Sequence, residues 1–284
     1  MTEEGIRIIR NWTRILIMGL AAGVFVFSIV KITVYYAEGY RNEDQSNELR
    51  KIYYTPEKKQ AAVGTHNYNI LQAVKIPGAS IALSLPDTSP KPIDKVWTVQ
   101  ERFVPLLERS QDVVGWLHIE GTAIDYPVVQ AEDNKFYLEK DITQQKNAGG
   151  SIFMDFRNHI KKEDRHTILY GHNMKNKTMF ADLLNYESEW YFDNHSLIQF
   201  DNLYENQKWQ VFSAYVTNIY DDYIRTQFES KEDYRTFLDD IQNKSLHPLN
   251  TTVNEDDIIL TLSTCSAASS EYRFAVHAKL IRED

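Results

Sequence analysis

The chain has 284 residues, and 43% of them are hydrophobic, which is enough for one or two domains with a sizeable core. Its formal net charge of −9 argues against a nucleic-acid-binding protein, because such proteins usually carry a basic face. The single cysteine excludes an intramolecular disulfide and any metal site built from several cysteines. The 17 Tyr and 13 Phe residues suit a β-rich fold or a groove for an extended peptide.

An apolar segment near the N-terminus, residues 15–37, carries one charge, Lys31, and about 20 apolar residues suffice to span a bilayer. Basic residues precede the segment and acidic residues follow it: Arg7, Arg10 and Arg14, then Glu38, Glu43 and Asp44. Because the basic side stays cytoplasmic, residues 1–14 are predicted to be a cytoplasmic tail and the rest of the chain to lie outside. The alternatives are a cleaved signal peptide, which has a shorter apolar core, and a buried soluble helix, which lacks this charge asymmetry.

Residues 38–96 are predicted to be an extracytoplasmic stalk and linker. The polar part up to Tyr54 is typical of a helical stalk, and residues 55–96 contain five prolines with little periodicity. A short strand at 81–86 is the one element expected there. This segment is expected to hold the following domain, residues 97–284, away from the membrane.

Within residues 97–284, apolar residues alternate with polar ones in short runs separated by turn residues. Strands are predicted at 113–119, 124–130, 151–156, 166–172, 208–219, 257–264 and 272–281, and helices at 99–110, 178–186 and 231–243. Seven or eight short strands at this spacing predict a mainly β fold with added helices, arranged as a closed or nearly closed barrel.

The only cysteine, Cys265, ends the alternating run "TLSTC" at a strand end. It is either an inert packing residue or a nucleophile, and a thiol becomes a good nucleophile beside a histidine or a cation. His172 also lies at a strand end, in "YGHNM", where Gly171 permits a sharp turn or a close approach. A hairpin between the last two strands would bring Arg273 beside Cys265.

The remaining histidines are less suitable partners for the thiol. His277 shares a strand face with Arg273 but lies four residues further along, about 13 Å away, and is predicted to be a surface strand residue. His118 is expected to face outward or to form hydrogen bonds with residues near it. Solvated surface is expected for His159, His166, His195 and His247, and His66 falls in the linker.

"TLSTC", an arginine at the start of the last strand and "ILYGH" upstream together resemble the sortase signature. In detail, the sequences of these motifs resemble those of class B sortases, which are cysteine transpeptidases of Gram-positive cell surfaces. The resemblance covers about residues 98–284, in the stretches 115–130, 149–158, 167–180, 221–228 and 273–281. It implies a sortase-like eight-stranded β-barrel behind an N-terminal transmembrane helix, with an extra N-terminal helix and a helix before the late strands.

The resemblance also implies roles for individual residues. Cys265 would be the nucleophile, His172 the general acid/base and Arg273 the cation near the oxyanion. Substrate-binding residues carried over in the same way are Asn134, Leu138, Tyr223, Ile224, Ser263 and Thr264. No metal and no cofactor are expected. The connection "SAASSEY" is shorter than in some class B members, and Ser266 stands where some of them carry a carboxylate.

The implied activity is a membrane-anchored transpeptidase with its catalytic domain outside the cell membrane. It would cleave an NPxTx-like C-terminal sorting signal after threonine through a thioester, then transfer the protein to an amine of the peptidoglycan cross-bridge. Its partners would be surface proteins that bear the signal, the cross-bridge amine and the membrane, without nucleic acid. The alternatives are a thiol peptidase that only hydrolyses, a pilin-polymerising sortase, and a non-catalytic barrel that binds surface proteins.

Overall fold

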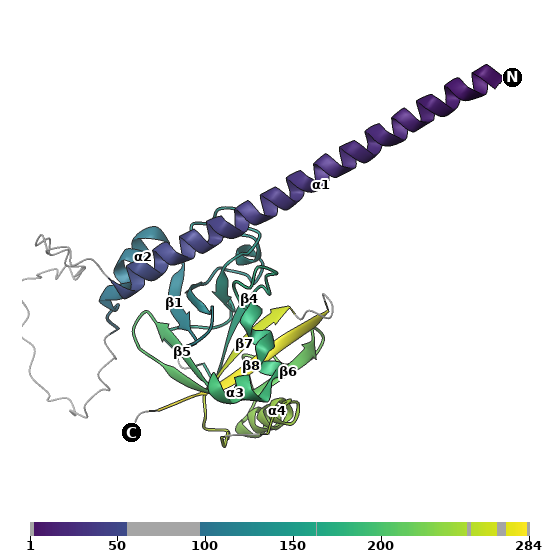
Figure 1. Ribbon diagram of the computed structural model, residues 1–284. Helices are drawn as coiled ribbons and strands as arrows, with labels where there is room; N and C mark the ends of the chain where they lie inside the picture. The colour runs from purple at the N-terminus through teal and green to yellow at the C-terminus, as the bar shows by residue number, and fades with distance from the viewer. Residues whose placement is uncertain (1–2, 56–96, 163, 249–250, 266–270, 283–284) are drawn as a thin grey trace, which may run out of the picture.

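The computed structural model describes residues 3–55, 97–162, 164–248, 251–265 and 271–282. The predicted linker at 56–96, with its strand at 81–86 and His66, and the connection after Cys265 lie outside these ranges. The described part consists of one long N-terminal helix and a barrel with short helices in its connections (Figure 1).

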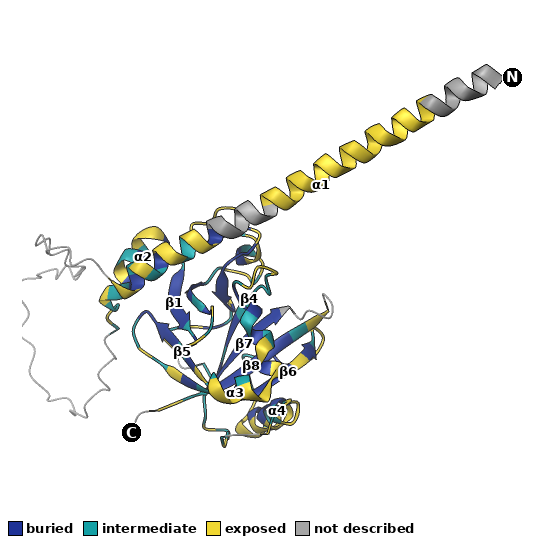
Figure 2. Ribbon diagram, viewed as in Figure 1, coloured by how far each residue is buried: buried dark blue, intermediate teal, exposed yellow. Residues whose placement is uncertain are grey.

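The N-terminal helix, α1 (Glu3–Tyr54), is 52 residues long. Its segment Trp12–Val34 has a mean hydropathy of 2.4 and is 0% buried, so it is apolar and long enough to cross a membrane. Figure 2 shows this part of α1 exposed, whereas the last turns of α1, against the barrel, include buried and half-buried residues. The stalk residues before Tyr54 are helical, as predicted, but they continue the apolar segment without a break and pack on the barrel through Leu49 and Tyr53.

Eight strands close into a barrel in the order β1-β2-β3-β4-β7-β8-β6-β5. Their bounds are β1 Val113–His118, β2 Asp125–Val129, β3 Ile152–Met154, β4 His166–Gly171, β5 Leu197–Asn202, β6 Lys208–Asn218, β7 Ile259–Cys265 and β8 Tyr272–Leu280. The pairs β2–β3 and β4–β7 are parallel and the other pairs are antiparallel. The predicted barrel is therefore confirmed. Of the eight strands, β5 alone was not predicted, because the buried polar residues Asp201 and Asn202 interrupt the alternation there.

Short helices fill the connections: η1 Glu101–Phe103, α2 Val104–Arg109, η2 Phe136–Leu138, η3 Ala181–Glu187, α3 Glu189–Asn194 and α4 Lys231–Asn243. The helix predicted at 99–110 is formed by η1 and α2, with a proline in the first turn of α2, where its missing N–H costs nothing. The helix predicted at 231–243 is confirmed as α4. The one predicted at 178–186 is instead the 3₁₀ helix η3, which begins at Ala181.

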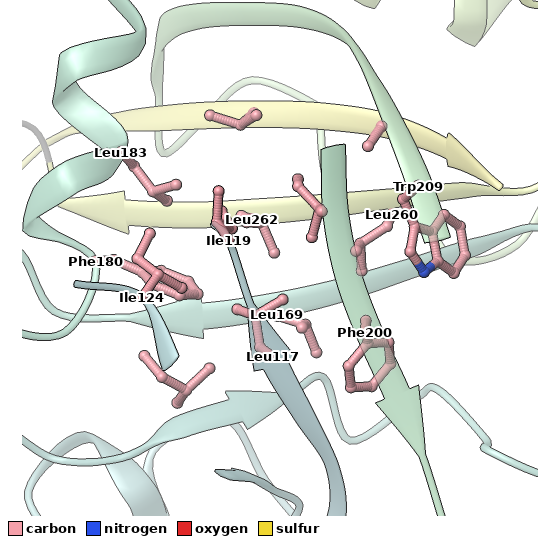
Figure 3. Packing of buried hydrophobic residues seen from close by; sticks show 14 of the residues in the cluster. Leu117, Ile119, Ile124, Leu169, Phe180, Leu183, Phe200, Trp209, Leu260 and Leu262 are labelled. Atoms are coloured by element: carbon pink, nitrogen blue, oxygen red, sulfur yellow. The ribbon is translucent and has the colours of Figure 1, made fainter. Parts of the chain in front are cut away.

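The hydrophobic core has three parts that follow from the alternation of the strands. One cluster fills the barrel, where Leu117 of β1, Leu169 of β4, and Leu260 and Leu262 of β7 point inward (Figure 3). A second lies beneath α1 and α2, and a third lies beneath α4. Because α4 covers the outer surface of β6, β7 and β8, the outward residues of these strands are also buried.

Two of the histidine predictions are wrong for this reason. His166 and His277, both expected at the surface, are 0% exposed. Both lie on the outer strand face that α4 covers, where His166 packs against Phe237 of α4. By contrast, the His159 side chain is 62% exposed, as predicted, and His118 is half-buried beside Asp125. His195 and His247, also expected at the surface, are half-buried, with rings packed on Tyr191 and Phe192.

Candidate active site

Strand register brings the three predicted catalytic positions to one rim of the barrel. Cys265, the last residue of β7, lies directly opposite Arg273 of β8. In the parallel pair β4–β7, Thr264 is level with Gly171, so that Cys265 and His172 each come one residue later. Neighbouring strands lie about 4.8 Å apart, which makes this rim the place where thiol, imidazole and guanidinium can act together. At Cys265 the structure describes the backbone alone.

Local packing holds His172 at the end of β4. Its carbonyl accepts a hydrogen bond from the Phe180 amide at 2.9 Å, which closes the loop after the strand. A Cβ on Gly171 would lie 2.5 Å from Cδ1 of Ile152 and 2.8 Å from the Phe180 ring. Gly171 is therefore required for close approach rather than for a turn, and this close packing fixes the direction in which β4 delivers His172.

The imidazole of His172 is oriented by a backbone carbonyl. Its Nε2 lies 2.7 Å from the carbonyl oxygen of Leu138. Because a carbonyl only accepts, Nε2 carries a hydrogen and Nδ1 is the atom that gains or loses the second proton. Gly150 packs closely against this Leu138 carbonyl. Its φ is +59°, and a Cβ at this position would lie 2.6 Å from the carbonyl oxygen.

Arg273 is half-exposed at the start of β8, and its Nη1 donates to the carbonyl of Tyr272 at 3.0 Å. Residues directly opposite in an antiparallel pair project to the same side of the sheet. Arg273 therefore shares its strand face with Cys265. Ser263, two residues before Cys265 on β7, lies on the same face. This face turns outward, away from the barrel interior.

The predicted substrate-binding residues border this face, with one exception. Tyr223 is 3% exposed, and its hydroxyl lies 2.9 Å from Oγ of Ser263, so that the segment before α4 is tied to β7. Leu138 is 36% exposed and lies next to His172 through its carbonyl. Thr264 is different, because strand alternation turns its side chain to the barrel side, away from Ser263 and Cys265.

A polar group that sequence analysis did not single out lies behind these residues. Asp155 is 0% exposed and accepts hydrogen bonds from Arg157, Tyr170 and Asn134. Burial by itself would raise the pKa of Asp155, but these hydrogen bonds, above all that from Arg157, hold the pKa below its usual value. An Asp and an Arg two residues apart directly after a strand, in "FMDFRN", are the signal that could have found this group.

Among the described residues, no group of three or more His, Cys, Asp or Glu side chains is arranged to hold a metal ion. The three predicted catalytic positions at the rim would bring together a thiol, an imidazole and a guanidinium. This combination supports nucleophilic attack with proton transfer and charge stabilisation.

Comparisons with known proteins agree with this fold. Residues 117–281 match the family model of the sortase domain. Over 186 residues the chain is 44% identical to sortase B of Staphylococcus aureus, covering 65% of this chain and 76% of that protein. It is 35% identical over 185 residues to sortase B of Listeria monocytogenes, covering 64% and 75%.

Among solved structures, sortase B from Bacillus anthracis in complex with AAEK1 matches with a TM-score of 0.69 and 34% identity, covering 87% of this chain and 100% of that one. The Staphylococcus aureus sortase B–substrate complex matches with a TM-score of 0.62 and 42% identity, covering 66% and 87%. The chain therefore belongs to the sortase family of cysteine transpeptidases. Within that family its similarity is to sortase B, the class predicted from its motifs.

Proposed function

We propose that this sortase cleaves a C-terminal sorting signal of the NPxTx type after its threonine and joins that threonine to an amine of the peptidoglycan cross-bridge. The observation that carries the proposal is the strand register at the barrel rim, where Cys265 lies opposite Arg273 and level with His172. A structure of S. aureus sortase B with substrate and one of sortase B complexed with triglycine support a peptide donor and an amine acceptor.

In the first step, the Cys265 thiolate attacks the carbonyl carbon of the signal's threonine. A C–S bond forms, the amide C–N bond breaks, and protonated His172 gives its second proton to the departing amine. Arg273 stabilises the negative charge that develops on the carbonyl oxygen. The product is a thioester between the surface protein and Cys265.

In the second step, the nitrogen of the acceptor amine attacks the thioester carbonyl. The C–S bond breaks, the new amide bond forms, and His172 takes the proton that the amine loses. The thiolate and the imidazolium are thereby regenerated. Because the two groups titrate as a pair, only the fraction of enzyme with a thiolate and an imidazolium is active.

The peptide binds along the outer face of β7, between η2 and the segment before α4. Ser263 and Tyr223 form the buried base of this groove beside Cys265, Ile224 follows Tyr223, and Asn134 and Leu138 come from the opposite side. The hydrogen bond between Tyr223 and Ser263 supports a preformed groove. Thr264 is left out of the groove because its side chain alternates to the barrel side.

The membrane arrangement is a single N-terminal span with the barrel outside the cell membrane. Arginines before the apolar segment and acidic residues after it support this orientation. Since α1 continues unbroken from Val34 to Asn42, which donates a hydrogen bond to Asn147 at the barrel, these two residues of α1 are separated by roughly 12 Å at about 1.5 Å per residue. The barrel is therefore held close to the outer leaflet, and the expected long spacer is not needed to position it.

The test uses the full chain in vesicles with a fluorogenic sorting-signal peptide and triglycine. Cys265→Ala should abolish the acyl-enzyme seen by mass spectrometry, and His172→Ala should lower kcat/KM at least about 10³-fold. His159→Ala is the matched control, because His159 is an exposed histidine away from the rim. Full cleavage by Cys265→Ala would refute the proposal. Cleavage without an amide-linked triglycine product would favour hydrolysis alone, and a product formed only with a pilin lysine would favour the pilin-polymerising alternative.

A further inference from the structure

Asp155 collects donors from three separate parts of the barrel. It follows β3 directly and is fully buried. The Arg157 guanidinium binds it in a fork, with Nε 2.8 Å from Oδ1 and Nη2 2.8 Å from Oδ2. The Tyr170 hydroxyl of β4 and the Asn134 amide of the segment before η2 each donate to Oδ2 at 2.9 Å.

Each of these donors is joined to a different wall of the proposed peptide groove. Tyr170 precedes His172 by two residues on the same strand face. Asn134 belongs to the wall that carries Leu138, and its Oδ1 accepts from the Phe156 amide at 3.0 Å, so that its amide orientation is fixed. The η2 wall and the end of β4 are thus held to one carboxylate.

Arg157 extends the same network to the third wall. While its Nη2 binds Asp155, the same nitrogen also donates to the carbonyl of Ile224 at 3.0 Å. Ile224 lies in the segment between β6 and α4, next to Tyr223. The guanidinium therefore sets the distance between this segment and the η2 wall, which is the width of the groove.

The strength of these links follows from burial. A carboxylate that is removed from water requires donors for its oxygens, and a forked arginine supplies two in a rigid plane. All four side chains must then keep their relative positions, because a shift of Arg157, Tyr170 or Asn134 would cost the buried carboxylate one of its partners. Lysine could replace the charge of Arg157 but not the fork.

We propose that Asp155 and Arg157 are positioning residues that set the width of the sorting-signal groove by joining Asn134, Tyr170 and the Ile224 carbonyl. Neither residue enters the reaction. Their contribution appears as affinity for the peptide, while the chemistry of the thiol at the rim is unaffected. This inference rests on the proposed function, since it concerns the peptide that the groove accepts.

An ion pair with a buried carboxylate could instead contribute only to stability, and the chain offers a matched control for that alternative. Asp201 of β5 is 1% exposed, like Asp155, and is paired with Arg102 at 3.0 Å. It also accepts from the Tyr53 hydroxyl at 2.7 Å and from Gln199 at 2.8 Å. It therefore has the same kinds of partner as Asp155, but it joins α1 to the barrel far from the rim.

The experiment compares Asp155→Asn and Asp201→Asn with the wild-type full chain in vesicles. Three quantities are measured: KM for the sorting peptide, the midpoint of thermal unfolding, and the rate at which iodoacetamide alkylates Cys265 without peptide. Asp155→Asn should raise KM about 10-fold or more while alkylation stays within about two-fold of wild type. Asp201→Asn should lower the midpoint of thermal unfolding about as much as Asp155→Asn does, but it should leave KM for the sorting peptide unchanged.

Where Asp155→Asn yields no folded protein, Arg157→Lys provides the test, with an expected rise in KM of about three-fold or more. An unchanged KM in the folded variant would overturn the inference. An equal rise in KM for Asp201→Asn, or a loss of alkylation parallel to the rise in KM, would also overturn it. Failure of the wild-type chain to cleave the peptide would instead count against the proposed function.

Discussion

Thr261 lies directly opposite His277 in the β7–β8 pair, and its Oγ1 is 2.7 Å from Nδ1 of that histidine. The same oxygen is 2.6 Å from Nε2 of His166, whose Nδ1 lies 2.5 Å from the Arg225 carbonyl. When His166 is neutral, its Nδ1 donates to that carbonyl and its Nε2 accepts from Thr261; His277 then donates to Thr261, and the Tyr215 hydroxyl donates to His277 at 3.1 Å. This chain of hydrogen bonds requires both imidazoles to be neutral.

The first prediction is that the barrel loses stability in acid because of these two histidines. Burial lowers the pKa of His166 to about 4 and lowers the pKa of His277 as well. In the unfolded chain both titrate near 6.5, so stability is complete above that pH and falls as the pH drops toward 4, where the unfolded chain binds more protons. His166 alone should cost about 3 kcal/mol over this range, measured by urea unfolding at pH 7.5 and pH 4.5.

The variant His166→Gln removes one titrating group and should flatten this pH dependence. His159→Gln, at a histidine whose side chain is 62% exposed, is the control for the loss of one histidine as such. An acid loss of the same size in His166→Gln and in wild type would contradict the prediction.

The second prediction concerns the contact between α1 and the barrel. The Tyr53 ring stacks on Trp116 with centroids 4.2 Å apart and an interplanar angle of 6°. Tyr53→Ala removes this stacking and one donor to the buried Asp201, so it should cost about 3–5 kcal/mol of unfolding free energy. Thermal unfolding of the full chain in detergent measures it. The neighbouring Tyr54 is 55% exposed, and Tyr54→Ala should cost about 1 kcal/mol or less. Equal losses in the two variants would show that α1 is not docked through Tyr53.

The third prediction is that Gly171 tolerates no side chain. Gly171→Ala would place a Cβ against Ile152 and Phe180, and such overpacking costs about 1–3 kcal/mol. The strand end must then shift, which displaces His172 and should lower kcat about 10-fold or more. Gly23→Ala, in the exposed part of α1 with nothing within 4 Å, is the control for activity. A Gly171→Ala enzyme with wild-type kcat would refute the argument from close packing.

The sequence predicted those parts of the fold that depend on local periodicity and on hairpin geometry. The alternation in 257–264 and 272–281 was sufficient to place Arg273 opposite Cys265, since a hairpin has little choice of register. Periodicity did not reveal that α4 covers the outer face of these strands. It therefore assigned His166 and His277 to the surface, because a polar residue on a buried second face has the same pattern as an exposed one.

Contacts between residues distant in sequence were also beyond the reach of the pattern. Tyr53 lies in a polar stretch, and only the tertiary packing shows that its ring is buried against Trp116. Asp155 and Arg157 have the composition of a surface turn, yet the Asp155 carboxylate is fully buried and is paired with the half-buried Arg157. Buried polar networks depend on which chain segments meet, and local sequence does not encode this directly.

The last prediction tests the link between the segment before α4 and β7. Tyr223→Phe removes the hydroxyl that lies 2.9 Å from Oγ of Ser263, and it leaves that buried oxygen without this partner. Each of Tyr223→Phe and Ser263→Ala should raise KM for the sorting peptide about five-fold, equivalent to roughly 1 kcal/mol. The double variant should be little worse than either single one, because both partners are then absent together. Tyr220→Phe, on a tyrosine that is 80% exposed, should leave KM unchanged. If the two single effects simply add in the double variant, the hydroxyl pair does not hold the groove, and Tyr223 and Ser263 contact the peptide independently.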